Sequence, residues 1–267
     1  MTHDNAEAVE TTVDGEVVHA VINRPQTRNA VSLAVISGLE RVITTAQEHR
    51  AKVVVLRGAN RTFCSGADLH ELRQLIGDPS SLRAFMSRFG AVLTDLKRAP
   101  WVTLAAVEGY AVAGGCELLL SCDIVVAAAN ARIGDGHVEY GLVPAAGSSI
   151  RLPQTILPAF ARYLLLTGES ISGTEAAHKG LAAVAVEPEA LDEEVDRIVA
   201  RLCSRGRDTL RTIKAMLAAG HTDPDPPSLR HELDLFLDHV GQDTDAQVGL
   251  QAFHDGVPAS FDDSAHR

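Results

Sequence analysis

The segment Ala105–Asp123, AAVEGYAVAGGCELLLSCD, constrains the fold of this chain more than any other part of it. The apolar run Val102–Val107 predicts a buried strand, which is interrupted at Gly109. A second apolar run follows the pair Gly114-Gly115 and predicts a helix over Gly115–Ser121. The sequence therefore predicts a strand that leads through a glycine-rich turn into a buried helix.

A single carboxylate, Glu117, lies within this predicted helix and is followed by three leucines. The first amides of a helix have no intrahelical acceptor and lie at the positive end of the helix dipole. They therefore suit an anion, or an oxygen on which negative charge develops. Burial of a carboxylate is costly unless it is paired or takes part in chemistry. Glu117 is thus either a salt-bridged core residue or an acid/base group beside a site for negative charge.

A second segment has the same organisation. Val53–Leu56 predicts a buried strand, and the loop Phe63–Leu69 leads into a helix expected over Ala67–Ile76, with Asp68 and Glu71 in its first turn. Each of the two units offers free backbone donors where its helix begins. Two N–H groups from separate loops that converge on one point can hold a carbonyl oxygen as it becomes negative.

These segments carry a resemblance to a known family. Phe63–Leu69, Gly109–Glu117 and Cys122-Asp123 resemble the enoyl-CoA hydratase/isomerase superfamily, also called the crotonase superfamily. Other elements of that family follow in the expected order along nearly the whole chain: Arg24–Ala30 (RPQTRNA), Gly141–Pro144 with Gly147 and Arg151–Pro153, Leu166–Gly168, Ala176, and Gly180-Leu181. The resemblance depends on this ordered series rather than on any one motif.

The alternation of strand-like and helical segments indicates an α/β fold. The resemblance refines this to a crotonase-like spiral of β-β-α units with a C-terminal helical region. The apolar pattern predicts strands at Val17–Asn23, Val53–Leu56, Val102–Val107, Asp123–Ala127 and Ala182–Val186, and helices at Leu33–His49, Ala67–Ile76, Ser81–Lys97 and Gly115–Ser121. From Leu191 onward it predicts only helices, at Leu191–Ser204, Thr209–Ala219, Ser228–Val240 and Thr244–His254.

We therefore divide the chain into two parts. Residues 1–190 are expected to form the α/β spiral core that binds acyl-CoA, and residues 191–267 a helical C-terminal region for packing and oligomerisation. Because the resembled family forms trimers, often paired into hexamers, the resemblance implies a homotrimer or hexamer.

Composition excludes several classes of protein. The chain has 267 residues, of which 46% are hydrophobic, and this is enough to bury a large core. A formal net charge of -11 argues against nucleic acid or an anionic membrane as a main partner, and no apolar run is long enough to span a bilayer. The polar segment Met1–Glu10 has no signal-peptide pattern, and the four cysteines have no metal-ligand spacing. We therefore expect a cytoplasmic protein without a metal.

The resemblance also implies which residues form the site. The N–H groups of Ala67 and Gly114 would hold the thioester oxygen, and Glu117 matches the first catalytic glutamate of the family's hydratases. His137 stands where those hydratases carry a second glutamate, and an imidazole can act there as acid or base. Contacts with coenzyme A are expected from Arg28, Ser65, Ala67, Asp68, Leu69, His70 and Gly114. Arg28 or Lys214 could supply a basic group for its phosphates.

On this basis we expect an acyl-CoA enzyme that adds water to a 2-enoyl-CoA through an enolate held by the two N–H groups. No cofactor beyond the coenzyme A of the substrate is expected. The missing second glutamate leaves alternatives open. An enoyl-CoA isomerase, an acyl-CoA hydrolase or a decarboxylase could each work with one carboxylate and an oxyanion hole. A non-catalytic acyl-CoA-binding protein would keep the fold and lose the pair of acid/base groups.

Overall fold

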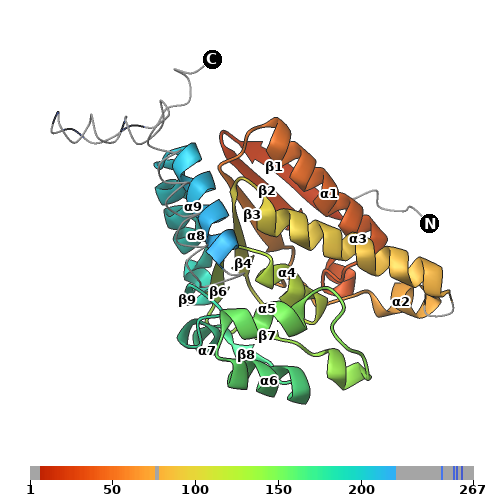
Figure 1. Cartoon of the computed structure of the whole chain (residues 1–267). Coiled ribbons are helices and arrows are strands. Elements are labelled where there is room, and N and C mark those ends of the chain that lie inside the picture. Colours follow the sequence, from red (N-terminus) through yellow and green to blue (C-terminus); the bar gives the residue numbers. More distant parts are fainter. Residues whose placement is uncertain are drawn as a thin grey trace.

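A six-stranded sheet lies at the centre of the part of the molecule that the structure describes (Figure 1). The computed structural model describes residues 7–75 and 78–220, together with the single positions 248, 255, 257 and 260. The strand order is β1 (Val9–Asp14), β2 (Val17–Ile22), β3 (Val53–Gly58), β4 (Val102–Val107), β6 (Ile124–Ala128) and β9 (Val184–Val186). β1 and β2 are antiparallel, and each later strand runs parallel to its neighbour.

A second sheet consists of three short strands in the order β5 (Tyr110–Val112), β7 (Arg132–Gly134) and β8 (Ile171–Ser172). In the chain, β5 follows β4 and β7 follows β6, so two strands of the main sheet each continue into a strand of the small one. β4, β5 and the helix α4 (Gly114–Leu120) form one β-β-α unit. The α/β fold expected from the sequence is confirmed.

Long helices cover the main sheet. α1 (Leu33–Glu48) packs on β1 and β2 and against α3 (Pro79–Arg98), to the right of the sheet in Figure 1. α8 (Leu191–Cys203) contacts β3 and β6, and α9 (Arg207–Gly220) contacts β4; both lie to the left. These two helices confirm the first half of the helical C-terminal region.

The last two helices expected from the sequence, Ser228–Val240 and Thr244–His254, lie outside the described residues. The division of the chain at residue 190 stays a prediction.

Three shorter helices lie toward the lower end of the molecule in Figure 1: α5 (Ser148–Thr155), α6 (Pro158–Thr167) and α7 (Gly173–His178). α4 lies nearer the middle of the view and contacts β5 and α5, while α2 (Leu69–Leu75) packs beside α3. Single 3-10 turns are η1 (Pro25–Thr27), η2 (His137–Tyr140) and η3 (Pro188–Ala190). None of the described helices is long and apolar enough to cross a membrane.

Asp68 explains why α2 begins two residues later than expected. Its Oδ1 accepts hydrogen bonds from the backbone N–H groups of His70 and Glu71, at 3.1 and 3.3 Å, as the side chain of an N-cap residue does. Its Oδ2 accepts a hydrogen bond from Arg24 at 2.9 Å. The helix therefore starts at Leu69, and Ala67 stays in the loop before it.

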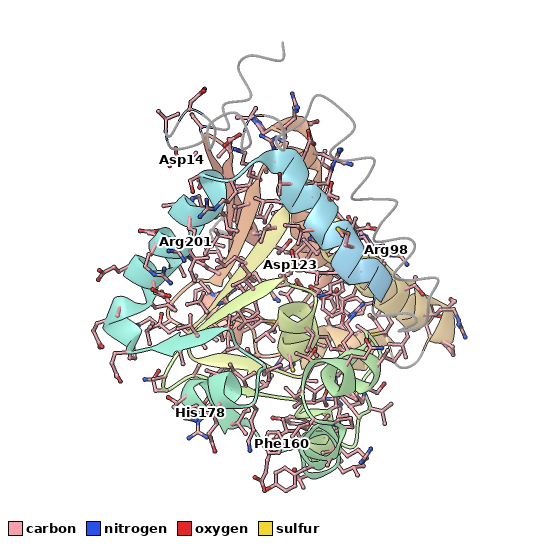
Figure 2. All side chains as sticks on the ribbon, turned by 60° about the vertical axis from the view of Figure 1, so that its left-hand side comes forward. Asp14, Arg98, Asp123, Phe160, His178 and Arg201 are labelled. Carbon is pink, nitrogen blue, oxygen red and sulfur yellow. The ribbon has the colours of Figure 1, made fainter. Side chains whose placement is uncertain are left out.

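Two buried lysines attach α8 and α9 to the sheet. Lys214 of α9 donates to Asp123 at 2.7 Å and to the carbonyl oxygens of Trp101 and Leu96 at 2.7 and 3.2 Å. Figure 2 shows Asp123 beside α9. Lys52, before β3, is paired with Glu16 at 3.0 Å and donates to the last residue of α8 at 3.3 Å. The ammonium of Lys214 is therefore committed inside the protein and has no proton left for a phosphate of coenzyme A.

Candidate active site

Two loops meet in the site, and glycines make that contact possible. Cys64 pairs with Ala111 in a parallel bridge, which joins the loop after β3 to β5. A Cβ on Gly115 would lie 2.1 Å from the carbonyl oxygen of Cys64, so a larger residue cannot occupy that position. Gly66 has φ +102°, and a Cβ there would lie 3.0 Å from the side chain of Ala113. The two strand–glycine–helix units therefore lie against each other, as the sequence predicts.

Ala113 turns the chain into α4 with a strained backbone. Its φ of 50° and ψ of -119° belong to a region that residues with a Cβ rarely adopt. The Cβ position of the next residue, Gly114, lies 3.4 Å from the amide nitrogen of Ala67. Neither the amide of Ala67 nor that of Gly114 has an acceptor within the described part of the chain. The structure thus brings the two predicted donors together, and their role as an oxyanion hole stays a prediction.

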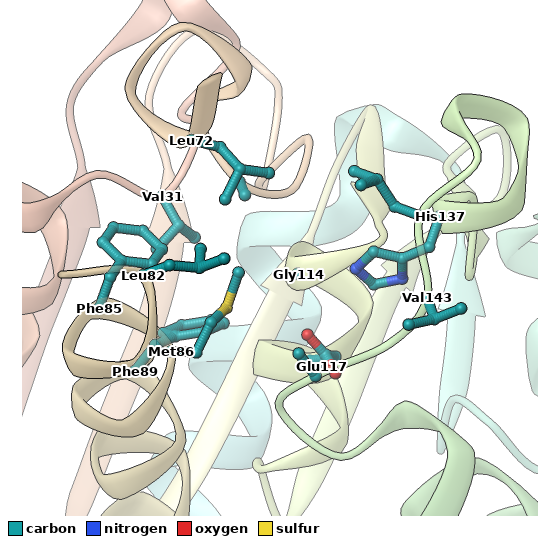
Figure 3. A pocket seen from close by; sticks show the side chains of 13 residues that line it. Val31, Leu72, Leu82, Phe85, Met86, Phe89, Gly114, Glu117, His137 and Val143 are labelled. Carbon is teal, nitrogen blue, oxygen red and sulfur yellow. The ribbon is translucent and has the colours of Figure 1, made fainter. Parts of the chain in front are cut away.

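A cavity of about 130 Å³ opens beside these amides (Figure 3). Ala67 and Gly114 line it together with Glu117 and His137. Most of its remaining lining is apolar and comes from α2, α3 and the loop after η2: Leu72, Leu82, Phe85, Met86, Phe89, Leu142, Val143 and Ala145. The cavity therefore combines a few polar groups with an apolar wall, which suits a ligand with a polar head and a hydrocarbon tail.

Glu117 is buried without a salt bridge to any described residue. Glu117 is only 2% exposed, and its Oε1 accepts hydrogen bonds from the backbone N–H groups of Ala146 and Ser148 at 2.7 and 3.2 Å. Burial raises the pKa of this carboxyl above its usual value, and the two N–H donors and the nearby His137 only partly oppose that effect. The alternative that Glu117 is a salt-bridged core residue does not hold.

His137 faces the same cavity from η2. Figure 3 shows its ring above the carboxylate of Glu117, on the side opposite the α3 side chains. Its Nδ1 lies 2.8 Å from Oδ1 of Asp135, a residue with only 1% exposure. Burial alone would lower the pKa of His137, but the hydrogen bond and charge of Asp135, helped by the charge of Glu117, raise it above its usual value.

Sequence reasoning missed Asp135. It treated His137 as a lone replacement for a glutamate, although the sequence Asp135-Gly136-His137 carried a signal. A carboxylate two residues before a histidine can reach its ring when a turn follows, and here β7 ends at Gly134 just before η2 begins. Among the described residues, no group of three or more His, Cys, Asp or Glu is arranged to hold a metal ion.

The residues expected to contact coenzyme A lie on or beside the loop that carries Ala67. The guanidinium of Arg28 lies over the ring of Tyr110, 5.5 Å from its centroid, and Ser65 donates to the carbonyl of Thr27 at 3.3 Å. Leu69 and His70 are exposed. The side chain of Asp68 is committed to Arg24 and to the cap of α2. Its backbone N–H donates to the carbonyl of Val31 and its carbonyl accepts from the N–H of Leu72, both at 2.8 Å. These contacts stay predictions.

The fold places the chain in a known class. The crystal structure of enoyl-CoA hydratase from Bacillus anthracis superposes with a TM-score of 0.89 at 29% identity, covering 95% of this chain and 98% of that one. An enoyl-CoA hydratase from Polaromonas sp. JS666 superposes with a TM-score of 0.90 at 25% identity, covering 95% and 99%. The chain therefore has the crotonase-type α/β fold.

Sequence comparison identifies the family. The profile of the enoyl-CoA hydratase/isomerase family matches residues 12–264, so the chain belongs to that family. It is 32% identical to crotonyl-CoA hydratase of Syntrophomonas wolfei over 249 residues, which cover 90% of this chain and 92% of that protein. It is 36% identical to human mitochondrial enoyl-CoA hydratase domain-containing protein 2 over 199 residues, 74% of this chain and 66% of that protein.

Proposed function

We propose that this protein is an enoyl-CoA hydratase that adds water to the double bond of a 2-enoyl-CoA. The observation that carries the proposal is the convergence of four groups on one cavity: the carboxylate of Glu117, the imidazole of His137, and the amides of Ala67 and Gly114. The names of its relatives from Syntrophomonas wolfei and Bacillus anthracis, a crotonyl-CoA hydratase and an enoyl-CoA hydratase, support it.

In the proposed reaction, the N–H groups of Ala67 and Gly114 donate to the thioester oxygen. Glu117 removes a proton from a water molecule, whose oxygen forms a bond to C3 while the electrons of the double bond move through C2 onto the thioester oxygen. The imidazolium of His137 then gives a proton to C2 of the enolate. Glu117 ends protonated and His137 neutral, and both return to their first states by proton exchange with water. The product is a 3-hydroxyacyl-CoA.

The protonation states that this reaction needs are consistent with the site. The raised pKa of His137 keeps it charged, and therefore able to donate a proton, at higher pH than a free imidazole. Glu117 must be ionised, and burial sets the lower pH limit at which it can act as a base. The rate should therefore follow a bell-shaped pH profile, with Glu117 responsible for the acidic limb and His137 for the alkaline limb.

The test uses the purified protein and crotonyl-CoA. Hydration removes the absorbance of the enoyl thioester and gives a product heavier by one water. An isomerase moves the double bond of a suitable enoyl-CoA without a change of mass, and a hydrolase releases the free thiol of coenzyme A. Binding of crotonyl-CoA without turnover would support a non-catalytic acyl-CoA-binding protein. Any of the last three results without hydration overturns the proposal.

We also propose that the protein is a cytoplasmic homotrimer or hexamer that needs no cofactor beyond the coenzyme A of its substrate. The described residues add a surface that suits contact between copies. Five apolar side chains on η2, α5, α6 and the loops next to them are at least 64% exposed: Tyr140, Val143, Ile150, Leu157 and Leu166. Light scattering at micromolar concentration should give the mass of three or six chains, and a monomer would contradict this assembly.

A further inference from the structure

We propose that Asp135 is a positioning residue that holds His137 with a proton on Nδ1, so that Nε2 is the nitrogen presented to the substrate. The inference rests on the proposed function, because it names the atom through which His137 acts. It concerns a residue that neither the motif series nor the predicted catalytic set contains.

Asp135 makes two hydrogen bonds to His137, one to its backbone and one to its ring. Oδ1 of Asp135 accepts from the backbone N–H of His137 at 3.3 Å and lies 2.8 Å from its Nδ1. One oxygen therefore fixes both the start of η2 and the orientation of the ring. An ionised carboxylate can only accept hydrogen bonds, so the ring nitrogen that faces it must carry a proton.

Asp135 is ionised although it is buried. Burial alone would raise its pKa, but the hydrogen bond and charge of His137 outweigh this, and its pKa lies below the usual value. The nearby hydroxyl of Ser148 also lowers the pKa of Asp135. Oδ2 of Asp135 and Oγ of Ser148 are both buried, and neither has a hydrogen-bond partner among the described residues. The N–H of Ser148 donates to Glu117 at 3.2 Å, so Ser148 interacts with the carboxylates of both Glu117 and Asp135.

Other ionisable groups around the pair come from α4 and α5. Glu117 adds a negative charge that favours the imidazolium of His137. Cys116 stays a neutral thiol, because burial raises its pKa. Arg151 donates to the carbonyl oxygen of Ala146 at 2.7 Å, and the charge of Glu117 acts on its guanidinium. Asp135 is thus the group that contacts the ring of His137 directly.

A histidine needs such a partner where a glutamate does not. The two oxygens of a carboxylate are equivalent, so either can exchange a proton with the substrate. The two nitrogens of an imidazole are not equivalent, and an unanchored ring populates both tautomers and several orientations. A carboxylate behind the ring selects one nitrogen, as carboxylates do for metal-bound and catalytic histidines.

The variant that tests this is Asp135→Asn, which keeps the shape and removes the charge. We expect kcat for crotonyl-CoA to fall about 10–100-fold, the range found when the carboxylate partner of a metal-bound histidine is removed. KM should change less than about two-fold, because Asp135 does not line the cavity. The alkaline limb of the kcat–pH profile should move to lower pH, because the imidazolium loses its anionic partner.

Glu139→Gln is the matched control. Glu139 is also two residues from His137, but it is exposed and makes no hydrogen bond to the ring. This variant should keep kcat within about two-fold and leave the pH profile unchanged, as expected of a surface substitution. An Asp135→Asn enzyme with the kcat and pH profile of the wild type would overturn the proposal.

A second measurement needs no Asp135 variant and no activity. In protein labelled with 15N-histidine, the His137 signals are identified by their loss in His137→Ala. At alkaline pH, the neutral ring should show a protonated Nδ1 and an unprotonated Nε2. The opposite tautomer would disprove the assignment of Nε2 even if hydration were confirmed. The predicted tautomer in a protein without hydratase activity would instead keep the positioning role and reject the proposed reaction.

Discussion

Two groups of buried charges in this protein look alike in the sequence and differ in the structure. Lys214 under α9 has three acceptors, one for each proton of its ammonium, and its partner Asp123 also accepts from the N–H of Thr103 at 2.8 Å. Glu117 has two N–H donors on one oxygen and no salt bridge to any described residue, and its carboxylate lines a cavity. Burial is common to both groups. What separates them is whether every charge is satisfied inside the protein.

This difference distinguishes a buried charge with a structural role from one that can take part in a reaction. A satisfied pair such as Lys214 and Asp123 fixes the position of a helix, and its removal should affect folding. A charge that is only partly satisfied and faces a cavity is stable enough to exist but can still react. Glu117, with its raised pKa, belongs to the second kind. Variants of the two groups should therefore separate stability from activity.

The largest expected effect is on activity, in Glu117→Gln. The amide keeps an oxygen for the N–H groups of Ala146 and Ser148 but cannot take a proton from water. The hydration rate should fall about 10²–10⁴-fold, the value of a positioned acid/base group. The melting temperature and the affinity for a saturated acyl-CoA should change little. If more than half of the rate remained, Glu117 would be a structural residue and the contrast with Lys214 would disappear.

The second-largest expected effect is a loss of unfolding free energy in the variant Lys214→Met. Removal of one partner of a buried ion pair leaves the other uncompensated, which costs about 3–5 kcal/mol. Urea unfolding should show this loss, whereas kcat per folded molecule should match the wild type. Lys97→Met is the control, since Lys97 is an exposed lysine on α3 and should cost less than about 0.5 kcal/mol. A Lys214 variant with full stability and lost activity would reverse the comparison.

A smaller effect on activity is expected in His137→Ala. The variant should lose at least about ten-fold in the hydration rate, the low side of general acid–base catalysis, together with the alkaline limb of the pH profile. His137→Glu rebuilds the glutamate pair and should restore hydration. If the native reaction is hydrolysis or isomerisation, the same change should reduce that reaction while hydration improves. No change in any acyl-CoA reaction would make His137 a packing residue.

Much of the fold could be predicted because long apolar segments carry a clear period. The strands β3 and β4 and the helices α1 and α3 lie within two residues of their predicted bounds. The prediction did not include β1, in which only Val9 is buried and no apolar alternation shows. It also lacked β5, β7 and β8, because strands of two or three residues are too short to show alternation. It also did not assign α5, α6 and α7, which lie in the segment interpreted through family motifs alone.

The site was predictable only as far as motifs identify single residues. Ala67, Gly114, Glu117 and His137 line one cavity, as the family resemblance implies. The strain at Ala113 and the hydrogen bond from His137 to Asp135 depend on backbone angles and side-chain distances that no periodicity encodes. For Lys214, the sequence suggested a functional role that the structure does not support. Its charge suggested a phosphate contact, but the way α9 packs on the sheet places it inside.

The smallest expected effect is on how the unfolding free energy depends on pH, through the titration of His137 and Glu117. The folded-state pKa of His137 is raised above 6.5, so the folded protein binds this proton more tightly than the unfolded chain does. Its stabilising contribution is fully present below pH 6.5 and is lost as the pH rises through the folded-state pKa. The raised pKa of Glu117 acts in the same direction from pH 4.5 upward. Unfolding free energies at closely spaced pH values should therefore fall less steeply above pH 6.5 in His137→Gln than in the wild type. Equal slopes in the two proteins would mean that Asp135 does not stabilise the charged ring of His137. The protonation of His137 would then contribute nothing to the pH dependence of stability.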